Sequence, residues 1–242
     1  KGMGLEFRRV LFRSQGWPVI FQAGASDPGR QLAAETAEAV FAAESTLEGS
    51  KAYYADVKAR ATAVGRNPDH IKIMPAVFLV VGDTVEEARA KRAKLDSLVH
   101  YDSGIHSLSG MLGHDVSGFD PDGPLPEIPE SNASKSSRRF MIELARAENL
   151  TIRQLAAKAG SYGGLTFVGT ARTIADEMQH WLEQGACDGF TTMFPYLPEG
   201  LEDFTGKVVP ELQARGLFRS EYEGETLRDH LGLPRPDNRF FA

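Results

Sequence analysis

The feature that most constrains the fold is a long apolar run at residues 71–82, IKIMPAVFLVVG. The run is nearly continuous rather than alternating, which is typical of a parallel strand that is buried on both faces. Thr84 and Glu87 follow with the spacing of a capping box and predict a helix that runs to about Val99. A buried strand followed at once by a helix indicates an α/β fold with a parallel sheet.

Strand and helix patterns alternate along the rest of the chain. Apolar runs predict strands at 18–23, 165–169 and 190–195. The run 39–43 fits either a short strand or the last turns of the preceding helix, because periodicity does not separate the two at this length. Helical patterns cover 31–38, 47–64, 138–146, 151–158, 171–184 and 204–215, the last interrupted near Pro210. This alternation favours a parallel sheet with right-handed crossovers.

The strand ending at Ala23 leads through a small-residue turn into the helix at 31–38. Such a turn aims backbone N–H groups and the positive end of a helix dipole at an anion. Gly24 allows close approach of the backbone, Ser26 offers a hydroxyl, and Arg30 adds a positive charge. The turn therefore predicts a phosphate site.

A purely structural interpretation of the same turn stays open. Ser26 or Asp27 would cap the helix, Pro28 would occupy its first position, and Gly24 would only form the turn.

Composition narrows the class of protein. The net charge of −6 over 242 residues argues against nucleic-acid binding. The single cysteine, Cys187, excludes an internal disulfide and is typical of a reducing compartment. We expect it to be a small buried hydrophobe rather than a reactive thiol. No apolar run reaches the roughly 18 residues that a membrane helix needs, and the six histidines lack metal-ligand spacing. We therefore expect a cytoplasmic protein without membrane or metal binding.

Three segments differ from the rest of the chain. Residues 1–14 contain LEFRRVLFRS, which resembles a translated sequencing adapter, although a short basic arm is the alternative. We therefore expect the natural domain at 15–242, as part of a longer protein.

Residues 100–164 form a long and weakly structured insertion, either a lid or binding excursion or a mobile surface loop. The tail, about 216–242, is expected to pack along the surface.

Four phrases carry a family resemblance: PVIFQAGAS at 18–26, FVGT at 167–170, DGFTTMFP at 188–195 and VPELQARG at 209–216. Together with the strand at 71–82, they resemble the bacterial-luciferase-like flavin monooxygenases. The similarity is to the nitrilotriacetate and dibenzothiophene-sulfone monooxygenase branch, with the long-chain alkane monooxygenase nearby. Because members of this branch are much longer, the resemblance implies a C-terminal fragment. It would hold about four βα units of a (β/α)8 TIM barrel, with the insertion before the last strand.

The resemblance also implies the chemistry. Family members use reduced FMN, supplied by a separate NAD(P)H:flavin reductase, and O2 to transfer one oxygen atom to a small organic substrate. In similar proteins the serine that corresponds to Ser26 contacts the FMN phosphate. Gly24, Ala25 and Ser26 are therefore the expected cofactor contacts, with Arg30 a further candidate. The catalytic residues are unknown and are expected in the missing N-terminal part.

Other positions and other classes of function remain as alternatives. A lid over the barrel mouth would let His106, His114 and Tyr162 face the substrate cavity, although each also fits a loop surface or a packing position. The chain would otherwise be an inactive half-barrel that binds flavin phosphate or self-associates into a homo-oligomer through an exposed sheet edge. A third interpretation is an unrelated phosphate-binding α/β protein.

Overall fold

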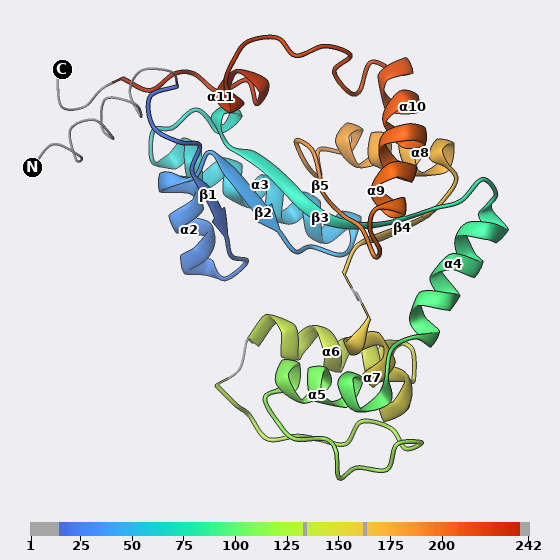
Figure 1. Ribbon diagram of the computed structural model, residues 1–242. Helices are drawn as coiled ribbons and strands as arrows, with labels where there is room; N and C mark the ends of the chain where they lie inside the picture. Colours follow the sequence, from blue (N-terminus) through green and yellow to red (C-terminus); the bar gives the residue numbers. More distant parts are fainter. Residues whose placement is uncertain (1–14, 133–134, 162–163, 238–242) are drawn as a thin grey trace, which may run out of the picture. The chain divides into compact units, whose positions relative to one another are not determined.

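The computed structural model describes residues 15–132, 135–161 and 164–237 (Figure 1). The predicted leader at 1–14 and the candidate Tyr162 lie outside the described residues. The strands are β1 (Phe21–Ala23), β2 (Ala39–Ala42), β3 (Lys72–Val81), β4 (Thr166–Gly169) and β5 (Thr191–Met193).

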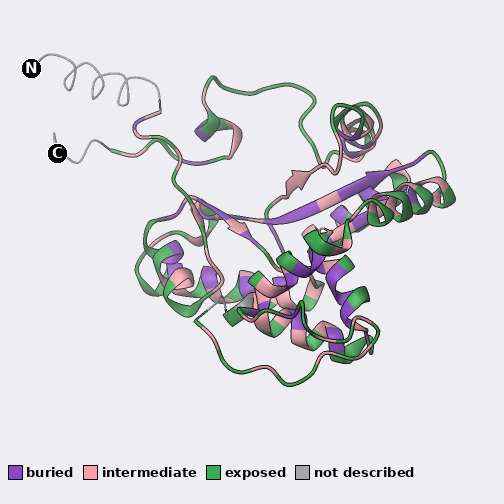
Figure 2. Cartoon of the chain, turned by 60° about the horizontal axis from the view of Figure 1, so that its bottom comes forward, coloured by how far each residue is buried: buried purple, intermediate pink, exposed green. Residues whose placement is uncertain are grey.

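The strands form one sheet in the order β1-β2-β3-β4, and β5 also pairs with β3. The pairs β1/β2, β2/β3 and β3/β4 are all parallel, with Phe21 opposite Ala39 and Val40 opposite Ile73. The predicted parallel sheet is therefore confirmed, and the ambiguous run at 39–43 is a strand. Figure 2 shows β3 buried along most of its length, as its continuous apolar sequence predicts.

Helices fill most of the intervals between strands. They are α2 (Asp27–Thr36), α3 (Leu47–Ala63), η1 (Pro68–His70), α4 (Val85–Ser97), α5 (Tyr101–Leu112), α6 (Lys135–Ala147), α7 (Ile152–Gly160), α8 (Ala171–Glu183), α9 (Glu199–Asp203), η2 (Phe204–Val208), α10 (Val209–Ala214) and α11 (Leu227–His230).

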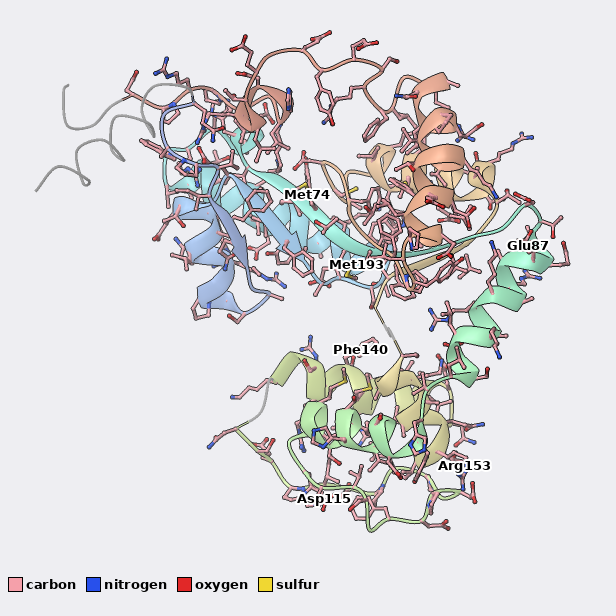
Figure 3. The ribbon with its side chains drawn as sticks, in the orientation of Figure 1. Met74, Glu87, Asp115, Phe140, Arg153 and Met193 are labelled. Atoms are coloured by element: carbon pink, nitrogen blue, oxygen red, sulfur yellow. The ribbon has the colours of Figure 1, made fainter. Side chains whose placement is uncertain are left out.

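The predicted caps and interruptions have local causes. The Thr84 hydroxyl caps α4 by accepting the Glu87 N–H at 3.1 Å, and the Glu87 carboxylate accepts the Asp83 N–H at 2.8 Å. Figure 3 labels Glu87 in the first turn of α4. The helix predicted at 204–215 instead begins at Glu199 and contains the π-helical segment η2. Pro210 follows this segment, and a proline has no N–H for the preceding turn and crowds its carbonyl, which widens the helix there.

The chain divides into two compact units, and the first contains β1, β2, α2 and α3. Helix α3 buries one face, Ser50, Tyr53, Val57 and Ala61, whose spacing is that of a helix packed on a core. The other core residues are Ala33, Ala34, Ala37, Val40, Ala42, Ile71 and Ile73. This core fixes α2 and the end of β1, which flank the predicted phosphate site.

The tail differs from the expected surface packing because two of its described residues, Arg228 and Leu233, are buried. Residues 218–225 are exposed, but Arg228 of α11 is only 2% exposed. Its guanidinium forms two hydrogen bonds to Glu38, at 2.6 and 2.8 Å, and another to the Trp17 carbonyl. Because Glu38 also accepts the Ile20 N–H at 3.0 Å, this buried ion pair ties the tail to the start of β1.

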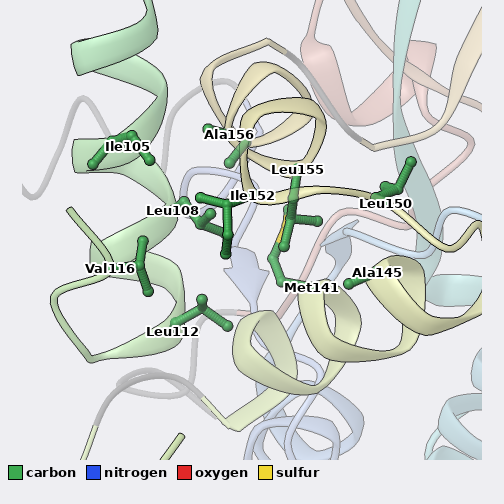
Figure 4. Close-up of a cluster of buried hydrophobic side chains, with 11 residues drawn as sticks. Ile105, Leu108, Leu112, Val116, Met141, Ala145, Leu150, Ile152, Leu155 and Ala156 are labelled. Atoms are coloured by element: carbon green, nitrogen blue, oxygen red, sulfur yellow. The ribbon is translucent and has the colours of Figure 1, made fainter. Parts of the chain in front are cut away.

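The second unit, Phe78–Ile174 with Met193–Phe204, contains the insertion. The expectation of weak structure there is wrong, because α5, α6 and α7 bury one apolar cluster (Figure 4). Hydrogen bonds also hold the loop between α5 and α6 in place. Arg138 donates to the Leu112 and Ile128 carbonyls, at 3.0 and 2.9 Å. The apolar residues were too widely spaced in sequence to show that they form one core.

The insertion also lies one strand earlier than the resemblance implied. Both β4 and β5 follow it, as the apolar runs at 165–169 and 190–195 predict, and both pair with the ten-residue β3. It therefore does not directly precede the last strand.

Candidate functional site

The predicted phosphate site is the turn between β1 and α2. Ser26 is the N-cap of α2, and its Oγ accepts the Gly29 N–H at 3.3 Å. The structural alternative for this serine is therefore confirmed, although Pro28 takes the second helical position rather than the first. A hydroxyl that accepts through a lone pair still has its hydrogen to donate, so capping leaves Ser26 able to bind an anion.

Three backbone donors lie at this turn. Within the described chain, no hydrogen bond uses the N–H groups of Ala25, Ser26 or Asp27. These groups lie at the positive end of the ten-residue helix α2. A Cβ added to Gly29 would lie 3.1 Å from the Ser26 Oγ and 3.3 Å from the Gly24 backbone. The turn is thus compact, rich in donors and suited to the phosphate of a cofactor.

Arg30 faces the protein side of the turn. Its Nε donates to the Ala25 carbonyl at 2.9 Å, and its terminal nitrogen pairs with Asp56 at 3.0 Å. The guanidinium also lies 4.8 Å from the centre of the Tyr53 ring. These three interactions already engage the Arg30 guanidinium within the protein. A direct contact between Arg30 and a cofactor therefore stays a prediction.

Tyr53 is a residue of this turn that the sequence reasoning missed. Its hydroxyl donates to the Gly24 carbonyl at 3.1 Å, although 29 positions separate the two residues. The spacing of Ser50, Tyr53, Val57 and Ala61 is the signal that places this tyrosine on the buried face of α3. The spacing does not show which residue Tyr53 bonds to, because the sequence does not show how α3 lies against β1.

The charges around the turn balance. Asp27 pairs with Arg60, and Asp56 pairs with both Arg60 and Arg30. Burial opposes ionisation of Asp56, but hydrogen bonds from Arg60 and Arg30 outweigh it and lower the pKa of this carboxyl. The two cations and two anions of these ion pairs cancel, so the pairs offer an anion no net positive charge, and an anion bound here would be held by N–H groups and the helix dipole.

The candidates on the substrate side lie in the second unit. His106 is exposed on α5, and His114 stacks on Phe119 with ring centres 5.9 Å apart. Both line an open hollow of about 730 Å³, together with Tyr101 and Asp115. The structure thus brings two of the three candidates to one surface, and their contact with a substrate stays a prediction.

Comparison with known proteins decides the family. Residues 6–188 match the luciferase-like monooxygenase family. The chain belongs to this family. The predicted resemblance is therefore confirmed.

Among the relatives of this luciferase-like chain is nitrilotriacetate monooxygenase component A of Aminobacter aminovorans, which is 52% identical over 93% of the chain. Dibenzothiophene-sulfone monooxygenase of Rhodococcus erythropolis is 40% identical over 92% of the chain. The chain spans about half the length of these curated relatives, 50% in both cases.

A solved structure of a riboflavin lyase, with modified FMN and its substrate riboflavin, is also similar. Its TM-score is 0.76 at 32% identity, and the match covers 93% of this chain and 49% of that one.

The described residues contain neither a membrane-spanning helix nor a cluster of metal-ligating side chains. None of their helices has the length and apolar character to cross a membrane. No group of three or more His, Cys, Asp or Glu side chains among them is arranged to hold a metal ion.

Proposed function

We propose that this chain is the C-terminal part of a two-component flavin monooxygenase that oxygenates a small organic substrate with reduced FMN and O2. Within it, the turn after β1 binds the FMN phosphate. The observation that carries the proposal is the set of unbonded N–H groups of Ala25, Ser26 and Asp27 at the start of α2. Membership of a monooxygenase family and the FMN in a similar solved structure support it.

In this proposal the residues of the turn bind and orient the cofactor. The three N–H groups and the Ser26 hydroxyl donate to phosphate oxygens, which fixes one end of the flavin. FMN, when bound in reduced form, supplies the oxygen chemistry, and a separate NAD(P)H:flavin reductase supplies the reduced cofactor. The protein contributes position and exclusion of water. The hollow that contains His106 and His114 is our candidate for the surface that meets the substrate.

The sheet edge favours a second candidate function for the isolated chain. β1 ends the strand order β1-β2-β3-β4, and Ile20 and Phe21 there are 41% and 55% exposed. An exposed edge strand pairs readily with another strand. In a whole barrel, a preceding strand would take this place. Alone, the chain would bind flavin without turnover or associate with a second copy.

Replacement of Ser26 tests the proposed site. We expect Ser26→Ala to weaken FMN binding by about ten- to 150-fold, because a hydrogen bond to a charged group contributes about 1.5–3 kcal/mol. Flavin fluorescence measures the dissociation constant. Ser26→Thr keeps the hydroxyl and should restore most of the affinity.

Thr151→Ala provides the matched control. Thr151 caps α7 with a contact to the Gln154 N–H of 3.3 Å, the same length as the Ser26 cap. The substitution Thr151→Ala should lower the free energy of unfolding by about 1 kcal/mol, as much as the loss of the Ser26 cap does. It should leave FMN affinity unchanged. Equal FMN affinity in Ser26→Ala and the unmodified chain would contradict the site. Oxygen consumption coupled to a reductase then shows whether the chain is catalytically active or only binds FMN.

A further inference from the structure

We propose that Tyr53 and Arg30 are positioning residues, which hold the carbonyls of the turn so that its N–H groups face the phosphate. We call these two residues the carbonyl clamp. The inference rests on the proposed function of the turn as the FMN phosphate site.

The geometry of the peptide bond carries the argument. In a planar trans peptide, the C=O and the N–H of the next residue point in opposite directions. Tyr53 holds the Gly24 carbonyl at 3.1 Å, so the Ala25 N–H is directed away from α3. Arg30 holds the Ala25 carbonyl at 2.9 Å, so the Ser26 N–H is directed away from the Arg30 side chain. The two clamped peptides therefore present two of the three unbonded donors, the N–H groups of Ala25 and Ser26.

The clamp itself is held firmly. Tyr53 is 1% exposed and lies within the core of the first unit. Burial raises the pKa of its hydroxyl, with Glu44 and Asp56 adding to the effect and Arg30 opposing it, so the group stays a proton donor. Asp56 fixes the guanidinium of Arg30, which also lies over the Tyr53 ring. Neither clamp residue needs to touch the cofactor in order to act.

This role predicts an effect on one part of the ligand. The clamp orients donors for the phosphate, so its loss should weaken binding of FMN and leave binding of riboflavin, which lacks the phosphate, nearly unchanged. A tyrosine that served only the core would change both affinities together, since it would alter the stability of the fold. The ratio of the two dissociation constants therefore separates positioning from packing.

Tyr53→Phe is the test, with Tyr54→Phe as its matched control. The Tyr54 hydroxyl donates to Asp188 at 3.1 Å, whereas the Tyr53 hydroxyl donates to the Gly24 carbonyl of the turn. Flavin fluorescence measures the dissociation constants of FMN and riboflavin for the full chain, and thermal unfolding monitors the fold. We expect Tyr53→Phe to reduce the preference for FMN over riboflavin by about three- to tenfold, the value of an ordinary hydrogen bond. Tyr54→Phe should keep the preference.

Each outcome decides a separate question. If the unmodified chain prefers FMN and Tyr53→Phe keeps the full preference, the clamp is overturned while the proposed function stands. If the unmodified chain shows no preference for FMN, the phosphate site is wrong, and the clamp is overturned with it. Should Tyr53→Phe fail to fold, the variant Arg30→Lys tests the clamp in its place. Lysine keeps the charge but has no fork to reach both Ala25 and Asp56, so the preference for FMN should fall in the same direction.

Discussion

Single side chains of α3 connect segments that lie far apart in the sequence. The hydroxyls of Tyr53, Tyr54 and Ser50 donate to Gly24, Asp188 and the Ala186 carbonyl. Adjacent tyrosines thus bond to opposite regions of the chain, because successive helical positions are about 100° apart. The sequence shows which face of α3 is buried, but the partner of each hydroxyl depends on tertiary contacts.

Cys187 provides a pH test at the same scale. It is 4% exposed, as expected for a small buried hydrophobe, and burial raises the pKa of its thiol from 9.0 to about 12. The unfolded chain therefore loses this proton near pH 9, whereas the folded chain keeps it until about pH 12. Because the unfolded state then binds fewer protons, the free energy of unfolding should fall as the pH rises through this window.

Urea unfolding at pH 8 and pH 10.5 measures this fall, with Cys187→Ala as the reference. The slope from one such group is at most about 1.4 kcal/mol per pH unit. We expect a steeper loss of stability in the unmodified chain than in Cys187→Ala. Parallel losses in the two proteins would show that the thiol titrates normally.

Among the elements, the crossing of α5 and α7 depends on two glycines. A Cβ at Gly104 would lie 2.5 Å from the Ala156 carbonyl oxygen, and one at Gly160 would lie 2.9 Å from the Gly104 Cα. Such distances are too short for real contacts, so the backbones of the two helices approach as closely as glycine allows. This contact anchors the helical core of the insertion.

Two alanine substitutions in α5 test the crossing. Gly104→Ala should destabilise the second unit by about 1–3 kcal/mol, the usual cost of overpacking. Gly110 is in the same helix, and a Cβ added there would meet no atom within 4 Å, so Gly110→Ala should be neutral or stabilise by about 0.5–1 kcal/mol. Thermal unfolding compares the two. Equal stabilities would show that α5 and α7 do not pack through Gly104.

The elements also show what the sequence predicts well. The buried strand β3 and the capped helix α4 follow from hydrophobicity and capping chemistry alone. The core of the insertion does not, because its apolar residues lie on three helices separated by a long polar loop. The π-helical segment before Pro210 was visible only as an interruption, since the same proline signal fits a kink or a widened turn.

For the whole molecule, the family resemblance supplied the functional hypothesis that residue patterns left open. The strand-turn-helix pattern alone allowed a cap or a phosphate site, and the structure shows that Ser26 caps α2 while its neighbouring N–H groups stay available. The carbonyl clamp could not be predicted from the sequence, because Tyr53 reaches Gly24 only in the folded chain. The tail was only partly predictable for the same reason: the ion pair of Arg228 joins it to Glu38, 190 positions earlier.

The central claim is that the turn between β1 and α2 binds the phosphate of FMN. Amide NMR of the ¹⁵N-labelled chain, titrated with FMN and separately with riboflavin, measures this most directly. We predict that the amide protons of Ala25, Ser26 and Asp27 shift downfield with FMN and hardly move with riboflavin, because only FMN offers phosphate oxygens to them. Unchanged resonances at these three residues, while FMN shifts others, would contradict the claim.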